Sequence, residues 1–170
     1  AVGAALVAAA FLRKNRHARV LPFEVKVVEV PLNPRDSVMT NAKALASIGG
    51  GGTNCSAPLA LLNRERAAVD VVILVSDNES WVDARSRRFD RGATQTMKAW
   101  EAMKQRNPRA KLVCIDIQPH ATSQAAERAD IMNVGGFSDA VFTMVKQFVD
   151  GNTGGEHWVN EIEKVSIARQ

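Results

Sequence analysis

The chain has 170 residues and a net charge of +4, and 46% of its residues are hydrophobic and 24% charged. This length suits one domain with a sizeable core, and the composition excludes intrinsically disordered, collagen-like and coiled-coil proteins. The apolar stretch over residues 1–11 is about half the roughly 20 residues that a membrane span needs. No basic residues precede that stretch, so we expect neither a membrane span nor a secretory signal.

The cysteines indicate a cytoplasmic protein, and the charges indicate a weak preference for polyanionic partners. Cys55 and Cys114 belong to no CxxC pair and to no Cys/His cluster, so we expect reduced thiols and a cytoplasmic protein. The mild excess of basic residues favours polyanionic partners without requiring one. Basic side chains gather at the end of the first predicted helix (Arg13, Lys14, Arg16 and Arg19) and after Trp81 (Arg85, Arg87, Arg88 and Arg91). The first group suits a helix C-terminus, whose partial negative charge attracts cations.

The first half of the chain predicts two helices and two short strands between them. Apolar residues with a helical period, alternating residues and prolines mark these elements. They are a helix over 1–15, a short strand over 19–23, an edge or hairpin strand over 25–30, and a helix from a cap at Asp36 or Ser37 to Ile48. The four glycines that follow Ile48 end this helix and allow backbone conformations with positive φ.

The second half alternates helices with apolar strands. The elements are a helix over 56–67 capped by Asn54 or Ser56, a buried strand over 70–76, a helix over 93–106, a strand over 111–117, a short helix over 122–128, a strand over 130–134 and a helix over 138–149. This alternation predicts a Rossmann-like α/β fold, with a doubly wound, mostly parallel sheet and helices on both faces. Residues 1–150 form the predicted domain, and residues 151–170 a linker with an amphipathic tail.

Two oxygen-bearing side chains stand where α/β sheets keep their sites. Thr53 follows the glycine turn, and Asp77 leaves a buried strand at its carboxyl end. Hydroxyl and carboxylate oxygens are hard ligands of the kind that magnesium selects. We therefore predict half of a metal site at Thr53 and Asp77. The weaker candidates nearby are Asn78, Glu79 and Asp116.

Nucleotide binding and catalysis find little support. No Lys-Ser/Thr follows Gly52, as a phosphate-binding P-loop requires. The three histidines, His17, His120 and His157, are scattered, and none accompanies a candidate nucleophile. His120 is the one predicted near strand ends. We expect no enzymatic activity, with a metal-assisted hydrolase on the doubly wound sheet as the alternative.

Three separated segments carry a family resemblance. They read Ala-Ala-Leu-Val-Ala-Ala-Ala-Phe-Leu from Ala4, Gly-Gly-Thr-Asn-Cys-Ser-Ala-Pro-Leu from Gly51 and Val-Ser-Asp-Asn-Glu-Ser-Trp from Val75. From about Ala4 to at least Phe148, the chain resembles the von Willebrand factor A domain of the Ro ribonucleoprotein autoantigen family, in a bacterial version. The resemblance implies a metal-ion-dependent adhesion site built from three loops, in which Thr53 takes the second position and Asp77 the third.

The first of those three loops does not match. The family carries Asp-x-Ser-x-Ser after its first, central strand, and this motif follows no apolar strand in the 170 residues. We expect the first strand, and with it the remaining metal ligands, to come from a preceding part of a longer polypeptide. Without that strand its neighbours would expose unpaired backbone groups, so the isolated chain should be unstable.

The resemblance also implies a function for the whole polypeptide. In the family, a ring of helical repeats precedes this domain, holding Y RNA on its outside and the single-stranded ends of misfolded noncoding RNAs in its hole. The chain is then expected to be a metal-dependent ligand-recognition module of a protein for noncoding RNA quality control. Its metal site would take an acidic group of a partner protein or an RNA phosphate. Arg85, Arg87 and Arg88 are the possible RNA contacts.

Overall fold

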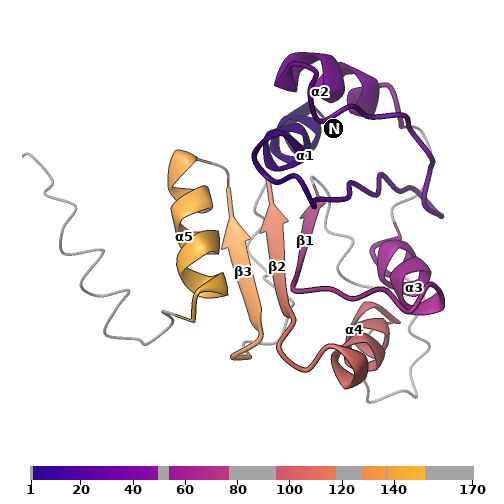
Figure 1. Ribbon diagram of the computed structural model, residues 1–170, viewed down its shortest axis with the longest axis vertical. Coiled ribbons are helices and arrows are strands. Elements are labelled where there is room, and N and C mark those ends of the chain that lie inside the picture. The colour runs from indigo at the N-terminus through magenta and orange to yellow at the C-terminus, as the bar shows by residue number, and fades with distance from the viewer. Residues whose placement is uncertain (1, 50–53, 77–94, 118–127, 137, 152–170) are drawn as a thin grey trace, which may run out of the picture.

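The computed structural model describes residues 2–49, 54–76, 95–117, 128–136 and 138–151. Five helices and three strands occupy these ranges (Figure 1). In chain order they are α1 (Val2–Lys14), α2 (Val38–Ala46), α3 (Ser56–Arg64), β1 (Val71–Ser76), α4 (Gln95–Arg106), β2 (Lys111–Asp116), β3 (Ile131–Gly135) and α5 (Asp139–Val149). None of the described helices is long and apolar enough to cross a bilayer.

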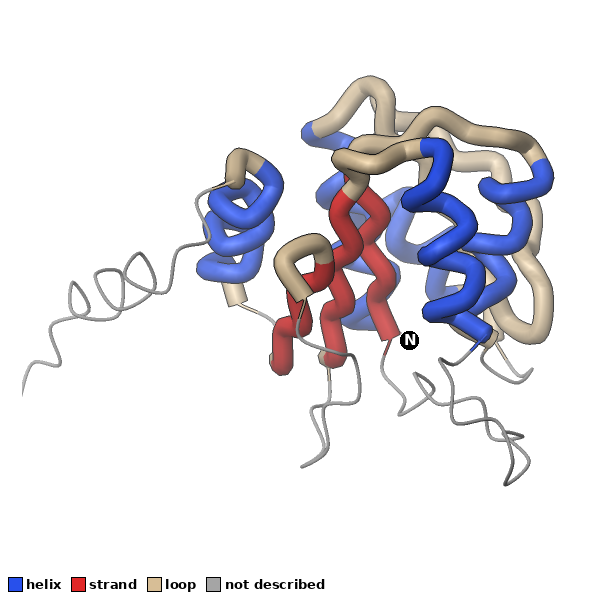
Figure 2. The backbone as a smooth tube through the Cα atoms, turned by 90° about the horizontal axis from the view of Figure 1, so that it is seen from below, coloured by secondary structure: helices blue, strands red, loops and turns tan. Residues whose placement is uncertain are grey.

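The three strands form one parallel sheet in the order β1-β2-β3 (Figure 1). Figure 2 shows the strands side by side in red. The register pairs Val71 with Lys111 at one end of β1 and Ser76 with Asp116 at the other. Parallel neighbours need a long connection between them. The segment from β1 to β2 contains α4, and 14 residues separate β2 from β3. The predicted α/β fold with a mostly parallel sheet is confirmed.

Helices cover both faces of the sheet, because alternate strand residues point to opposite sides. On one face, α3 and α4 pack on β1 and β2 through a buried cluster that includes Leu59, Trp100 and Leu112. On the other face, α1 and α5 pack on β2 and β3, with Val7 and Phe148 among the buried residues. The sheet is therefore doubly wound, as its sequence pattern predicts.

A hydrogen-bonded tryptophan anchors the first of these faces. The Trp100 side chain is fully buried, and its Nε1 donates to Asp130 Oδ2 at 2.9 Å. Arg128 Nε donates to Asp130 Oδ1 at 2.9 Å. Burial alone would raise the pKa of the Asp130 carboxyl, but the hydrogen bonds from Trp100 and Arg128 outweigh it, and the pKa is lowered. The carboxylate thus joins α4 to the turn before β3.

The α2 helix begins where its capping residue predicts. Ser37 Oγ accepts a hydrogen bond from Thr40 N at 3.0 Å, which selects Ser37 over Asp36 as the cap. Buried Asn41 fixes the preceding loop, because its Nδ2 donates to Asn33 O at 2.8 Å. The α2 helix then packs on α1 through small residues such as Ala9 and Ala42.

The two strands predicted between α1 and α2 are wrong. Residues 19–23 and 25–30 form no strand, and only an isolated antiparallel bridge joins Phe23 to Val27. Glu24 N donates to Lys26 O at 3.0 Å, so the chain turns back on itself between them. A strand needs a neighbour with free backbone groups, and no described strand pairs with this segment. The predicted helix over 122–128 and the tail fall almost wholly outside the described residues.

The α3 helix ends earlier than predicted, at Arg64, without a glycine to stop it. Arg66 follows with φ of 53°, and Ala67 N donates to Leu62 O at 3.0 Å. This is the Schellman ending, in which glycine is the usual residue at the left-handed position. For arginine the conformation costs on the order of 1 kcal/mol.

Candidate functional site

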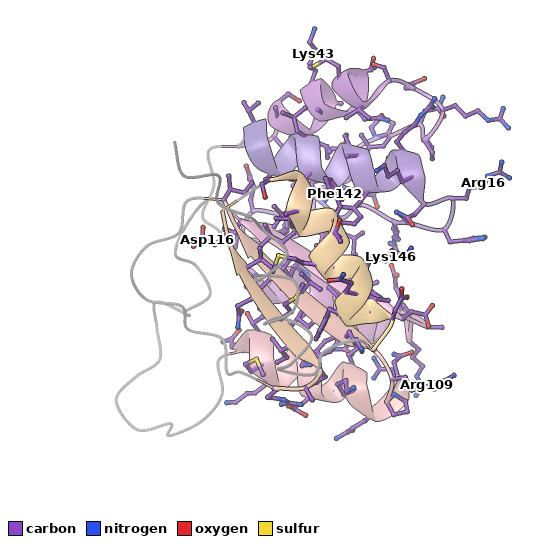
Figure 3. All side chains as sticks on the ribbon, turned by 90° about the vertical axis from the view of Figure 1, so that its left-hand side faces the viewer. Arg16, Lys43, Arg109, Asp116, Phe142 and Lys146 are labelled. Carbon is purple, nitrogen blue, oxygen red and sulfur yellow. The ribbon has the colours of Figure 1, made fainter. Side chains whose placement is uncertain are left out.

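The described strands end together at the carboxyl edge of the sheet. Ser76 lies opposite Asp116, and Asp116 lies opposite Gly135. Ile117 N donates to Ser76 O at 2.9 Å, and Gly136 N donates to Asp116 O at 2.7 Å, so the alignment continues past the strand ends. Ser76 is buried, whereas Asp116 is half-buried and marks this edge in Figure 3. The described strands therefore end in register at the edge where α/β sheets usually bind ligands.

The two predicted metal ligands, Thr53 and Asp77, lie outside the described residues. So do Asn78, Glu79, His120 and His157, and the predicted RNA contacts Arg85, Arg87 and Arg88. Ser76 and Asn54, their neighbours in the chain, are described. Ser76 ends β1 directly before Asp77, and Asn54 directly after Thr53 binds the start of α3, where its Oδ1 accepts from Ser56 N at 3.1 Å. The predicted cap at Asn54 or Ser56 is wrong, because the N-cap residue of α3 is Cys55, whose side chain makes no capping hydrogen bond.

Two buried thiols relate the segment after Thr53 to the sheet. Cys55 and Cys114 are both buried, and they interact electrostatically. Cys114 stands two residues before the end of β2, so the start of α3 lies over the carboxyl half of the sheet. Burial, with a smaller effect of Cys55, raises the pKa of the Cys114 thiol to about 12.

The donor chemistry of this edge fits a hard cation. A neutral thiol is a poor metal ligand, because metals bind the thiolate. The hydroxyl of Ser76 and the carboxylate of Asp116 at this edge are oxygen groups, of the type that magnesium and manganese prefer. Within the described residues, no three histidine, cysteine, aspartate or glutamate side chains come together as a metal site. A metal here would depend on Thr53, Asp77 and further oxygen ligands.

A groove of about 1360 Å³ runs along β1. All residues of β1 line it, together with Phe11 of α1, Leu62 of α3 and Val145 of α5. Helices from both faces of the sheet thus contribute to the groove, and β1 is the edge strand of the described sheet. The groove therefore lies beside the free edge of β1.

Aromatic and basic side chains stand where α1 meets α5 along this groove. The centres of the Phe11 and Phe142 rings are 5.0 Å apart, and Lys14 Nζ lies 5.2 Å from the centre of the Phe142 ring. His17, in the turn after α1, is exposed and also lines the groove. Sequence reasoning missed the groove, because its walls come from segments that are far apart in the chain. The one hint in the sequence is the missing first, central strand, whose neighbours were expected to expose unpaired backbone groups.

Comparisons with known proteins agree with this fold. A family profile described as the Ro60 vWA domain matches residues 1–149. The chain is 26% identical over 152 residues to the RNA-binding protein RO60 of Deinococcus radiodurans, which covers 88% of this chain and 27% of that protein. The crystal structure of the Deinococcus radiodurans RO (RSR) protein matches with a TM-score of 0.70 at 25% identity, over 89% of this chain and 29% of that one. The chain thus spans less than a third of these relatives, and it belongs to the Ro60 von Willebrand factor A (vWA) domain family.

Proposed function

We propose that the chain is a metal-dependent ligand-recognition module of a Ro-like RNA-binding protein. The observation that supports this proposal is the alignment of Ser76 with Asp116 at the carboxyl edge, where α/β sheets bind ligands, because Asp77 directly follows Ser76 in the sequence. Thr53 and Asp77 are the proposed ligands, and magnesium is the proposed ion. An Asp-x-Ser-x-Ser loop would supply the remaining oxygens.

The groove beside β1 supports the proposal that a further strand carries the Asp-x-Ser-x-Ser loop. A parallel strand in the groove would lie about 4.8 Å from β1 and would end at the same edge of the sheet. The loop after such a strand would then reach the neighbourhood of Asp77. We assign this strand to a preceding part of a longer polypeptide, where a helical-repeat ring is also proposed.

The partners follow from the ion and from the relative. A magnesium ion held by protein oxygens keeps open positions for an oxygen of a ligand, here an acidic group of a partner protein or an RNA phosphate. The relative in Deinococcus radiodurans is named an RNA-binding protein. We therefore propose noncoding RNA, including Y RNA and misfolded RNA, as the partner of the complete protein in the cytoplasm, with a role in RNA quality control.

A metal-assisted hydrolase is the less favoured function. Hydrolysis needs a base or nucleophile near the metal, and the histidine that the structure describes, His17, follows the C-terminal end of α1. Figure 3 places its neighbour Arg16 on the opposite side of the domain from Asp116. The proposal is therefore a module that binds without catalysis.

The metal assignment is tested by manganese and magnesium titration of the complete protein. Asp77→Ala should weaken metal binding by about 10- to 100-fold, the usual effect of removing a ligand or its supporting carboxylate. Asp70→Ala is the matched control, because Asp70 directly precedes β1 and is exposed at its other end. Isothermal titration calorimetry, or electron paramagnetic resonance of free manganese, measures the metal affinity of both variants. Equal metal affinity in Asp77→Ala and the unchanged protein would overturn the assignment.

The predicted RNA contacts have a separate test. If Arg85, Arg87 and Arg88 touch phosphates, their replacement by glutamine should lower the slope of log affinity against log salt by about 2. Fluorescence anisotropy with a labelled RNA, at several salt concentrations, gives this slope. An unchanged slope would assign the three arginines to solvated surface.

A further inference from the structure

Four exposed arginines gather where α3 and α4 end. Hydrogen bonds hold the two helix ends together: Asn63 Nδ2 donates to Ala99 O at 2.8 Å, and Asn107 Oδ1 accepts from Val69 N at 3.0 Å. The Arg106 guanidinium also donates to Asn63. We call the resulting surface the arginine ridge, and its members are Arg64, Arg66, Arg106 and Arg109.

The charge of the ridge is poorly compensated. Glu65, the acid within the ridge sequence, is held by Arg19, whose Nη2 donates to its Oε1 at 3.1 Å. Asp130 is held by Arg128 and Trp100. Asp70 is the other acid beside these helix ends. Among the described residues, Arg66 and Arg109 have no ion pair and no side-chain hydrogen bond, so their guanidinium groups face solvent as free donors.

Helix stabilisation explains only half of the ridge. Arg64 and Arg106 lie in the last turns of α3 and α4, where a cation offsets the partial charge of the helix end. Arg66 and Arg109 lie beyond those turns. Arg66 moreover adopts the left-handed conformation in which glycine is favoured, so an arginine at this place works against the backbone. Arg66 differs in charge from glycine, the residue that this backbone conformation favours.

The ridge lies at the amino edge of the sheet, at the opposite end from the candidate metal site. Lys111 N donates to Asp70 O at 3.0 Å, which places residues 64–70 and 106–111 at the same end of the strands. In Figure 3, Arg109 and Asp116 lie on opposite sides of the domain. A ligand at the ridge would therefore leave the metal edge accessible.

We infer that the arginine ridge binds the phosphate backbone of RNA. This inference rests on the proposed function for RNA as the polyanion. The position and charge of the ridge give the binding surface. Guanidinium groups match phosphate oxygens with paired hydrogen bonds, and contacts to phosphates carry no base sequence information. The ridge is thus a sequence-independent contact, separate from Arg85, Arg87 and Arg88. Sequence reasoning missed it, because its two pairs of arginines are some 40 residues apart and meet only after folding.

The test uses the complete protein and a fluorescein-labelled RNA stem–loop with a single-stranded tail. The ridge variant carries Arg64→Gln, Arg66→Gln and Arg109→Gln and keeps Arg106, which binds Asn63. Its slope of log affinity against log salt should fall by about 2, and its affinity at 0.1 M salt by up to about 100-fold. The matched control replaces the same number of exposed cations, Lys26, Arg35 and Lys43, and should keep the slope. Figure 3 shows Lys43 far from Arg109.

A single substitution separates RNA binding from a structural role. Arg66→Gly should lower the slope by roughly 0.7 to 0.9, while the urea midpoint stays the same or rises, because glycine suits the left-handed position. Equal slopes for the ridge variant and the unchanged protein, with RNA still bound, overturn this inference and leave the proposed function standing. If the unchanged protein does not bind the RNA at all, the proposed function itself fails.

Discussion

Replacement of Trp100 by alanine is expected to lower the free energy of unfolding by about 3–5 kcal/mol. The side chain is fully buried between α4 and the sheet, in the cluster that holds Leu59 and Leu112. Its removal leaves a cavity among residues from both helices on this face. It also takes a hydrogen-bond donor from Asp130, whose carboxylate is only partly exposed.

Urea denaturation of the complete protein, followed by circular dichroism, measures this loss. The transition that Trp100→Ala moves belongs to this domain. Trp100→Phe is the matched control, because it keeps an aromatic ring in the core and removes the donor to Asp130. We expect it to cost about 1.5–3 kcal/mol, the usual contribution of a hydrogen bond to a charged group, because Arg128 still binds Asp130. A loss below about 1 kcal/mol in the alanine variant would contradict the packing described for this face.

Alkaline pH is expected to destabilise the domain through Cys114. In the folded state its thiol keeps the proton up to a pKa of about 12, whereas an ordinary thiol loses it near 9.0. Between these values the unfolded chain binds fewer protons than the folded one, so stability falls as pH rises. The contribution is complete below pH 9 and is lost above pH 12. The stability lost relative to neutral pH is about 1.4 kcal/mol at pH 10 and about 3.7 kcal/mol at pH 12.

The comparison of Cys114→Ala with the unchanged protein isolates this effect. The difference in urea midpoint between the two should shrink steadily from pH 8 to pH 10, since the variant has no thiol to ionise at this position. Cys55→Ala serves as the control for the second buried thiol and should keep most of the pH dependence, because burial is the larger cause of the shift. The chain has no tyrosine, which leaves fewer groups that titrate in this range. A constant difference between the two midpoints would show that Cys114 ionises in the folded state.

The elements that the sequence predicted correctly are those that local pattern determines. The unbroken apolar run before Ser76 predicts a buried strand, and the spacing of Trp100 and Met103 predicts the buried face of α4. Residues 25–30 failed because their alternation is compatible with a strand, whereas strand formation depends on a partner elsewhere. Val25 is 65% exposed in the turn that forms instead.

The candidate site divides in the same way. A carboxylate directly after a buried strand can be recognised in one segment, so the sequence alone makes Asp77 a candidate. Ser76, the residue before it, ends β1 in register with the end of β2. The groove beside β1 and the arginine ridge could not be predicted, because each is assembled from segments that meet only in the folded chain. Arg66 carried a further difficulty, since neither glycine nor asparagine marks its left-handed position.

The order of the strands has a consequence for the synthesis of the protein. Because β1, β2 and β3 lie side by side in the order in which they leave the ribosome, each new strand can add to an edge that is already in place. The sheet then grows away from the groove. Among the described strands, β2 and β3 both add on the side of β1 that faces away from the groove. A strand that occupies this edge from an earlier part of a polypeptide would be available before β1 emerges, so the centre of the sheet could form first and the rim last.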